Sequence, residues 1–425
     1  MIECKNLTNG LRISTAGAYF ACCHTFNHPF KDENGDELIA SKHTIQDALN
    51  APSRLKMIED FNNDIRHPAC VVCWGAEDAG FVSKRQRDNQ TYRYFETRKD
   101  DEIFFLELNL GNTCNLACRI CHISASSRWK DFHHVIEPGI TEEHLDHYVD
   151  KFSKAFKDDS MVWDELMKIL PQVRSLDIYG GEPMLMKKQW EILAKSVELG
   201  YSKNQQMSFN TNGTIINDKY IDILSSFEQA RIGFSIDGIG KRFNYIRYYG
   251  DWDVVKENVN TWQVKTAQRP EVKIRFEVCC TISMLNVLYV FEMVDYVIEN
   301  NLKLMIAFVF NPPHLHIGNM PEDSKRVIIA ILSAQINKRR AAFESDDTLT
   351  DKEKEYRREV YYQAEKVINT LKLPTKCNLF YWSEFIRQTC ELDVLRKQSF
   401  KETFPELFEI YKLNDEPCFN PKKLI

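Results

Sequence analysis

The chain has 425 residues, more than one compact domain usually contains, and 44% of them are hydrophobic, which is enough to bury a sizeable core. The net charge of −6 gives no global electrostatic argument for binding a nucleic-acid backbone. The opening residues MIECKNLTNG lack the layout of a signal peptide, and no apolar run reaches the ~18 residues that span a bilayer. We therefore expect a cytoplasmic protein of two or three domains, in which the 13 cysteines are metal ligands or reduced thiols.

The first hundred residues are predicted to form a distinct unit that carries two groups of cysteines. Residues 11–22 alternate loosely around Gly17, as a hairpin does, and a helix is predicted over residues 44–64. A C-x-x-C pair follows, and such a pair lets one tight turn supply two thiolates while the hairpin supplies others. The candidate metal ligands on these segments are Cys22, Cys23, Cys70 and Cys73.

Two other interpretations of these cysteines stay open. The same thiols can hold zinc together with His24. Cys70 and Cys73 can also be a thioredoxin-like redox pair, although no βαβ pattern surrounds them.

The stretch Leu110 to His122, LGNTCNLACRICH, follows a strand-like run over residues 103–109. Its cysteines are spaced C-x-x-x-C-x-x-C, and three thiols without a fourth suggest a [4Fe–4S] cluster with one open iron, because a structural zinc takes four protein ligands. Taken alone, this stretch also matches the sequence pattern of c-type haem attachment, and it matches a zinc knuckle in which His122 is the fourth ligand. The three candidate ligands are Cys114, Cys118 and Cys121.

Three later segments are short strands that each end in a turn containing glycine. They read SLDIYGGEP over 175–183, FNTNG over 209–213 and IGFSIDG over 232–238. Together with the three cysteines, and in this order, they resemble the radical S-adenosylmethionine (SAM) enzymes over residues 103–313. Ile120 departs from that family, which usually has an aromatic residue before the third cysteine.

The resemblance implies a chemistry. The three cysteines would hold a [4Fe–4S] cluster, and the amino and carboxylate groups of SAM would chelate its fourth iron. One electron would then break a carbon–sulfur bond and release a 5′-deoxyadenosyl radical that abstracts hydrogen from an unactivated carbon. A small electron donor such as flavodoxin or ferredoxin is the implied partner.

The N-terminal unit is similar to the twitch domain, the shortened relative of the SPASM domain that holds an auxiliary iron–sulfur cluster in many radical SAM enzymes. Here it precedes the barrel, as in an N-terminal twitch family of phages and marine bacteria. The resemblance implies as ligands Cys70, Cys73 and at least one of Cys22 and Cys23. The fourth is the other of that pair, Cys4 or an open position.

Residues 103–313 alternate short strands with long helical connectors, as repeated βα units do. Residues 231–237 and 273–282 are apolar on one face and polar on the other. A parallel sheet covered on both sides is apolar on both faces, so the polar face predicts a lumen that holds ligands. The alternative, an antiparallel sheet with one solvated face, does not suit connectors as long as 163–170 and 188–199.

The predicted fold class is α/β, a partial (β/α)6 barrel of the radical SAM type. It is preceded by a small α+β twitch-like cluster-binding domain and followed by a helical C-terminal segment. We place the domains at residues 1–100, 101–317 and 318–425.

Ligands of such sheets lie beyond the carboxyl ends of the strands. The glycines of the Gly-Gly-Glu-Pro turn permit a close backbone approach, so the glutamate can accept hydrogen bonds from the SAM ammonium. Ser235 and Arg247 are candidates for the SAM carboxylate and ribose, although Arg247 can equally stack on the surface among tyrosines. Asn210 and Asn212 either border the nucleoside part of SAM or only cap the ends of strands. The candidate cofactor-binding residues are Gly180, Gly181, Glu182, Pro183, Asn210, Asn212, Ser235, Asp237 and Arg247.

The alternation on residues 273–282 points Arg275, Glu277 and Cys279 into the lumen. Glu277 is the candidate base or amine ligand, and Cys279 the candidate hydrogen-atom donor or cluster ligand. Buried cysteines are more often inert, and this alternative applies above all to Cys280 on the apolar face.

The C-terminal region is predicted to form charged helices over 322–343, 351–371 and 382–397, which either cover the open side of the barrel or dock a partner. Its cysteines lack ligand spacing and are predicted to be ordinary thiols; they are Cys377, Cys390 and Cys418.

The predicted function is radical SAM modification of a peptide or protein, assisted by an auxiliary [4Fe–4S] cluster. The alternatives are modification of a nucleotide, hypermodified nucleobase or sugar, and a non-catalytic iron–sulfur or zinc protein for electron delivery. The Gly-Gly-Glu-Pro turn and the polar lumen favour an enzyme, because an electron carrier needs no SAM pocket. No oligomeric state is predicted.

Overall fold

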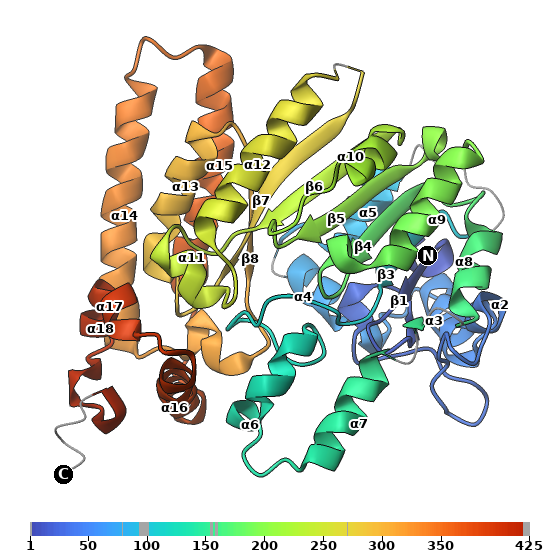
Figure 1. Cartoon of the computed structure of the whole chain (residues 1–425), viewed down its shortest axis with the longest axis horizontal. Helices are drawn as coiled ribbons and strands as arrows, with labels where there is room; N and C mark the ends of the chain where they lie inside the picture. The colour runs from blue at the N-terminus through green and yellow to red at the C-terminus, as the bar shows by residue number, and fades with distance from the viewer. Residues whose placement is uncertain are drawn as a thin grey trace.

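The computed structural model describes residues 2–78, 80–92, 102–153, 156–157, 160–269 and 271–419. Its eight strands form one sheet in the order β2-β1-β3-β4-β5-β6-β7-β8 (Figure 1). All neighbours are parallel except β2, which pairs antiparallel with β1. The strands are β1 (Gly10–Ile13), β2 (Tyr19–Phe20), β3 (Phe105–Asn109), β4 (Ser175–Tyr179), β5 (Gln206–Thr211), β6 (Gln229–Ser235), β7 (Ile274–Ile282) and β8 (Lys303–Phe308).

From β3 to β8 each strand lies beside the next one in the chain, because a helix carries the chain back between them. The α/β class is confirmed, and the helical connectors predicted near 163–170 and 188–199 are α8 and α9. The sheet is open, with β2 and β8 at its edges, so β3 to β8 are a partial barrel rather than a closed one. The connecting helices are α6 (His133–Ile136), α7 (Glu142–Ser153), α8 (Val162–Ile169), α9 (Lys187–Glu198), α10 (Asp218–Ser225), α11 (Lys241–Ile246), α12 (Trp252–Ala267) and α13 (Val290–Glu299).

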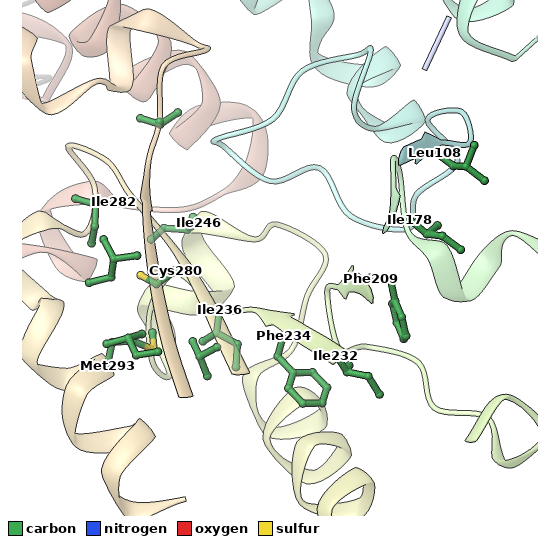
Figure 2. Packing of buried hydrophobic residues seen from close by; sticks show 14 of the residues in the cluster. Leu108, Ile178, Phe209, Ile232, Phe234, Ile236, Ile246, Cys280, Ile282 and Met293 are labelled. Atoms are coloured by element: carbon green, nitrogen blue, oxygen red, sulfur yellow. The ribbon is translucent and has the colours of Figure 1, made fainter. Parts of the chain in front are cut away.

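The main core lies between one face of this sheet and the connecting helices (Figure 2). Alternate strand residues such as Phe209, Ile232 and Phe234 are fully buried there, and burying each such side chain contributes about 1.5–3 kcal/mol. Cys280 lies in the same layer with 3% of its surface exposed, as the alternation predicts. The polar residues between them therefore share the opposite face of the sheet.

The N-terminal segment extends this sheet. The predicted hairpin is confirmed, because β1 and β2 pair antiparallel on either side of Gly17, and β1 then pairs in parallel with β3. The predicted domain boundary near residue 100 lies outside the described residues. The helices of this segment are α1 (Lys5–Thr8), α2 (Ile45–Leu49), α3 (Pro52–Asn62), α4 (Val71–Asp78) and α5 (Lys84–Thr91).

The C-terminal helices cover the β8 edge and reach the carboxyl ends of the strands. The helix α15 lies along β8, where Gln363 Oε1 accepts a hydrogen bond from the Ile306 N–H at 3.3 Å and Lys366 Nζ donates to the Ile306 carbonyl at 3.3 Å. Of the two predicted roles, covering the open side is therefore the one observed. No helix among the described residues is both long and apolar enough to cross a bilayer. The helices are α14 (Glu322–Glu344), α15 (Asp351–Leu371), α16 (Leu379–Arg396), α17 (Phe400–Thr403) and α18 (Pro405–Ile410).

The prediction of ordinary thiols is wrong for two of the C-terminal cysteines. Cys390 on α16 and Cys418 form a disulfide, with their Cα atoms 6.1 Å apart. The end of the chain folds back toward α16 through aromatic packing. The ring of Phe419 lies 6.3 Å from that of Phe400 on α17, which lies 5.9 Å from that of Phe385 on α16. This packing joins cysteines that are 28 residues apart in sequence and that show no local spacing pattern.

Candidate functional site

The loop after β3 brings Cys114, Cys118 and Cys121 together at the carboxyl end of the strand. The thiol of Cys121 donates a hydrogen bond to Cys118, which lowers the pKa of Cys118, and the Arg247 guanidinium acts in the same direction against burial. Burial raises the pKa of Cys114 to about 12, and the neighbouring Cys118 adds to this. The donor set therefore consists of three closely placed thiols on one loop, which fits a cluster held by three cysteines.

The turn after β4 packs directly on the backbone of this loop. A Cβ atom at Gly181 would lie 2.0 Å from the Thr113 carbonyl oxygen, and one at Gly180 would lie 2.6 Å from the Gly111 oxygen. The Glu182 N–H donates to the Thr113 carbonyl at 2.8 Å and joins the two segments. The close approach that requires these glycines is therefore made to the cysteine loop.

The carboxylate of Glu182 is buried and has protein donors on both oxygens. Oε1 accepts from the Thr211 hydroxyl at 2.7 Å and from the Met184 N–H at 3.0 Å, and Oε2 accepts from the Asn212 N–H at 2.7 Å. Burial raises the pKa of Glu182, and the Asn212 N–H is the largest of the contacts that oppose this. Pro183 follows as a buried residue whose carbonyl accepts from Trp190 Nε1 at 3.0 Å. Glu182 thus ties the turn to the end of β5 and keeps one lone pair of Oε2 for a ligand.

Asn212 joins the end of β5 to the first cysteine. Its Nδ2 atom donates to Asn115 Oδ1 at 2.8 Å and lies 4.0 Å from Cys114 Sγ, and its Oδ1 atom accepts from the Thr214 hydroxyl at 2.7 Å. The side chain of Asn115 donates to the same hydroxyl at 2.8 Å. Sequence reasoning missed Asn115 and Thr214, although both lie next to residues that it identified.

Arg247 is buried and lies against the second cysteine. Its Nη2 atom is 2.7 Å from Asp237 Oδ2, and its Nη1 atom is 3.8 Å from Cys118 Sγ. Asp237 is also buried and accepts from the Thr281 N–H at 2.8 Å. The alternative of a surface-stacked Arg247 is wrong, and the two predicted residues form an ion pair beside the cluster loop. Ser235 is half-buried at the end of β6, in register with Cys279.

A second polar group lies on the same face of the sheet, deeper in the lumen. Arg231 pairs with Glu277, and its Nη2 atom is 3.2 Å from Cys279 Sγ. Asn210 belongs to this group, because its Oδ1 atom is 3.2 Å from Arg231 Nη1 and 3.6 Å from Cys279 Sγ. Burial raises the pKa of Cys279 to about 12.

This lumen cluster of Arg231, Glu277, Cys279 and Asn210 differs from the predicted arrangement in three ways. Arg275 is exposed at the amino end of β7 and takes no part in it. Arg231 was not among the predicted site residues, although the alternation of β6 places it on the polar face with Ser235. Asn210 and Asn212, predicted to act together, contact different groups.

The N-terminal thiols form a third site. Burial raises the pKa of Cys4 to about 12, and the thiols of Cys70 and Cys73 lie close enough to raise it further. Cys22 lies near Cys4, and Cys70 lies near Cys22. Cys23 lies near Glu107 on β3 and Lys84 on α5, and the only thiol near it is that of Cys22 among the groups that shift its pKa.

The donor chemistry of this third site is four buried or half-buried thiols, with the Nδ1 atom of His24 3.6 Å from Cys73 Sγ. Over the described part of the chain, no three His, Cys, Asp or Glu side chains are arranged to hold one metal ion. An iron–sulfur cluster binds each thiolate to a different iron atom, so four thiols fit its donor requirement.

Comparison with known proteins gives a family match over the central part of the chain. The model of the Radical SAM superfamily matches residues 108–265. That range contains the three cysteines, the Gly-Gly-Glu-Pro turn and the strand end at Ser235. No curated protein matches the chain.

Three solved structures illustrate the structural neighbours. Native anSMEcpe with bound AdoMet is 18% identical at a TM-score of 0.37, with 54% of this chain and 58% of that chain covered. SuiB of Streptococcus suis is 14% identical at a TM-score of 0.35, covering 77% and 68%. SuiB bound to its precursor peptide SuiA is also 14% identical, at a TM-score of 0.33, covering 54% and 45%. The chain thus spans about half the length of two of these proteins.

The TM-scores of these neighbours are too low to carry an argument about this chain, so the family match and the geometry of the thiol loop decide. Residues 108–265 match the Radical SAM superfamily and therefore form a radical SAM domain within this chain.

Proposed function

We propose that the protein is a radical SAM enzyme that abstracts a hydrogen atom from a peptide or protein substrate, with an auxiliary [4Fe–4S] cluster in its N-terminal unit. The observation that carries the proposal is the loop of three thiols packed on the Gly180-Gly181 turn inside the matched domain. When bound, the cluster and SAM supply one electron and a carbon–sulfur bond whose cleavage gives methionine and a 5′-deoxyadenosyl radical. A small donor protein such as flavodoxin or ferredoxin delivers the electron.

The side chains around the loop have defined roles in this proposal. Cys114, Cys118 and Cys121 hold the cluster and leave one iron free. Arg247 and Asn212 present N–H groups to two of the sulfur atoms and so stabilise thiolate charge.

SAM would lie beyond the carboxyl ends of β4 to β6. The free lone pair of Glu182 Oε2 is the acceptor for its ammonium, and the half-buried Ser235 hydroxyl is a donor for its carboxylate. Arg247 and Asp237 satisfy each other's charge, so their contribution is to hold the loop rather than to bind SAM directly.

The lumen cluster is the proposed substrate site. Glu277 is the candidate base, and it forms an ion pair with Arg231. The raised pKa of Cys279 keeps its side chain a neutral thiol at neutral pH, which is the form that can give a hydrogen atom. Both groups are buried on the face of the sheet that carries the site.

The auxiliary cluster would be held by Cys4, Cys22, Cys70 and Cys73 in a unit that resembles the twitch domain. This grouping favours Cys22, which lies near Cys4 and Cys70, over its neighbour Cys23. Four protein ligands leave no iron open, so substrate coordination at this cluster is not part of the proposal. The peptide class of substrate rests on the twitch resemblance.

Anaerobically reconstituted protein tests the two clusters. Wild type is expected to contain about eight irons, and a Cys114/Cys118/Cys121 triple alanine variant about four, with a SAM-dependent change in the electron paramagnetic resonance signal only in wild type. Iron content that stays the same in the variant would refute the assignment of this loop.

Cys22 and Cys23 offer a matched pair for the auxiliary site. C22S is expected to lose the irons of the N-terminal cluster, whereas C23S, which changes the next thiol in the same turn, keeps them. Equal loss in both variants, or zinc in place of iron, would contradict the proposed ligand set.

Release of 5′-deoxyadenosine reports the substrate class. We expect it to increase with a peptide fraction of the host cell and to stay at its basal level with nucleoside, nucleic-acid and sugar fractions. Stimulation by nucleosides or nucleic acid alone would replace the peptide by a nucleotide-type substrate.

A further inference from the structure

Arg396, the last residue of α16, is a buried cation without a conventional partner. Only 4% of its surface is exposed, and none of its three guanidinium nitrogens has a hydrogen-bond partner among the described residues. An uncompensated buried charge costs several kcal/mol, so an arrangement of this kind calls for an anion or another source of stabilisation.

Three aromatic rings surround this guanidinium. Its Cζ atom lies 5.0 Å from the ring centroid of Trp129, 4.3 Å from that of Phe132 and 4.7 Å from that of Tyr248. A desolvated cation–π contact is stabilising, and it compensates part of the hydration that the guanidinium loses on burial. The rings hold the cation in place but carry no net negative charge.

Two of the same residues support the cluster loop, one through its ring and the other through its backbone. Trp129 Nε1 donates to the Cys118 carbonyl at 2.9 Å, and the Tyr248 carbonyl accepts from the Ala117 N–H at 3.0 Å. The aromatic cage of Arg396 is therefore built on the backbone around the second cysteine.

Among the residues that the structure describes, no carboxylate forms an ion pair with Arg396. Asp393, one turn earlier on α16, is 2.6 Å from Arg119 Nη2 and accepts from the Tyr245 hydroxyl at 2.7 Å. Burial lowers the pKa of Arg396 to about 9, and the nearby Arg119 lowers it further. The cage is hydrogen-bonded to the cysteine loop at Ala117 and Cys118, so the anionic charge that this loop would carry with a cluster bound lies on the side of Arg396.

We infer that Arg396 is a counter-cation for the [4Fe–4S] cluster on Cys114, Cys118 and Cys121, supplied by the C-terminal helix. It is a positioning residue that tunes the cluster and does not touch substrate. The inference rests on the proposed function, because it requires the cluster to be present. A cluster with three thiolates carries negative charge and gains one more on reduction, so a nearby cation favours the reduced form.

The test is a redox titration of the full chain, monitored by electron paramagnetic resonance. SAM is added afterwards, and only the part of the signal that responds to it is assigned to this cluster. At the potential that half-reduces wild type, R396M is expected to show a reduced-to-oxidised ratio lower by about tenfold, equivalent to about 59 mV for one electron. R396K, which keeps the charge, is expected to restore most of the ratio. A chelator challenge should also remove iron faster from R396M than from R396K.

Arg387 on the same helix is the matched control. It is 30% exposed and paired with Glu384 and Glu391, so R387M also removes a cation from α16 and is expected to leave the ratio unchanged. If R396M does not fold by circular dichroism, R396Q takes its place in the comparison with R396K.

The possible outcomes distinguish failure of the role of Arg396 from failure of the proposed function. Absence of a SAM-responsive cluster in wild type would refute the proposed function. A cluster of normal iron content with equal ratios in wild type, R396K and the neutral variant would refute the role of Arg396 and leave the proposed function standing.

Discussion

Replacement of Gly181 by alanine tests whether the Gly-Gly turn is a packing element of the cysteine loop. The new Cβ atom would lie 2.0 Å from the carbonyl oxygen and 2.7 Å from the carbonyl carbon of Thr113, and 2.9 Å from that of Asn112. These atoms are backbone, so they cannot rotate away as the end of a flexible side chain does. The turn and the loop must separate, or both must deform.

The cost follows from three contributions. Overpacking of this kind costs about 1–3 kcal/mol, and an L-residue at a positive φ, here +28°, costs roughly 1–2 kcal/mol. Separation also weakens the hydrogen bond from the Glu182 N–H to Thr113, whose loss costs about 0.5–1.5 kcal/mol. Together these effects predict a loss of about 3–6 kcal/mol, a large part of the stability of an ordinary domain.

Gly200 provides the control, because its φ is +78° and no atom lies within 4 Å of a Cβ built there. G200A therefore incurs only the backbone strain, about 1–2 kcal/mol. Urea unfolding of the apoprotein by circular dichroism should give a lower midpoint for G181A than for G200A, and G181A should retain less iron after reconstitution. Equal midpoints and equal iron would refute the reasoning.

Three further changes have expected outcomes. Burial raises the pKa of Asp177 to about 6, so its ionisation destabilises the fold as pH rises from about 4 to about 6. In unfolding experiments, the stability of D177N relative to wild type should increase by roughly 2–3 kcal/mol across that range and no further above it. A difference in stability that does not depend on pH would contradict this. R119M leaves Asp393 without its buried partner and should lower the stability of the apoprotein by about 3–5 kcal/mol in urea unfolding; an unchanged midpoint would mean that α16 is not anchored by this pair. G233A places a Cβ atom 2.7 Å from Cys279 Sγ and should reduce substrate-dependent release of 5′-deoxyadenosine while the iron content stays normal; lost iron would show instead that the lumen supports the cluster.

Much of the site could be predicted locally. The spacing of Cys114, Cys118 and Cys121 lies within one loop, and the strand alternation needs only neighbouring residues, so Glu277 and Cys279 were identified on the polar face before any fold was known. The pair that begins at Cys70 was found in the same way. Such patterns persist in the structure because periodicity and turn geometry depend on short stretches of chain.

Contacts between segments that are distant in sequence leave no local sequence pattern that predicts them. The choice of Cys22 over Cys23 depends on how the turn after β2 faces Cys4 and Cys70, which no spacing rule specifies. The disulfide of Cys390 likewise depends on the chain end folding back on α16.

The amino-acid sequence by itself determined the class of the central domain, since the three-cysteine loop and the strand-ending turns are local features. Only the tertiary structure decided what surrounds these features. It turned Glu182 and Arg247 toward protein partners, added Arg231 to the lumen, and placed Arg396 beside the cysteine loop. The physical reason is that charge compensation and close packing are set by atoms brought together from distant parts of the chain, after the local elements have formed.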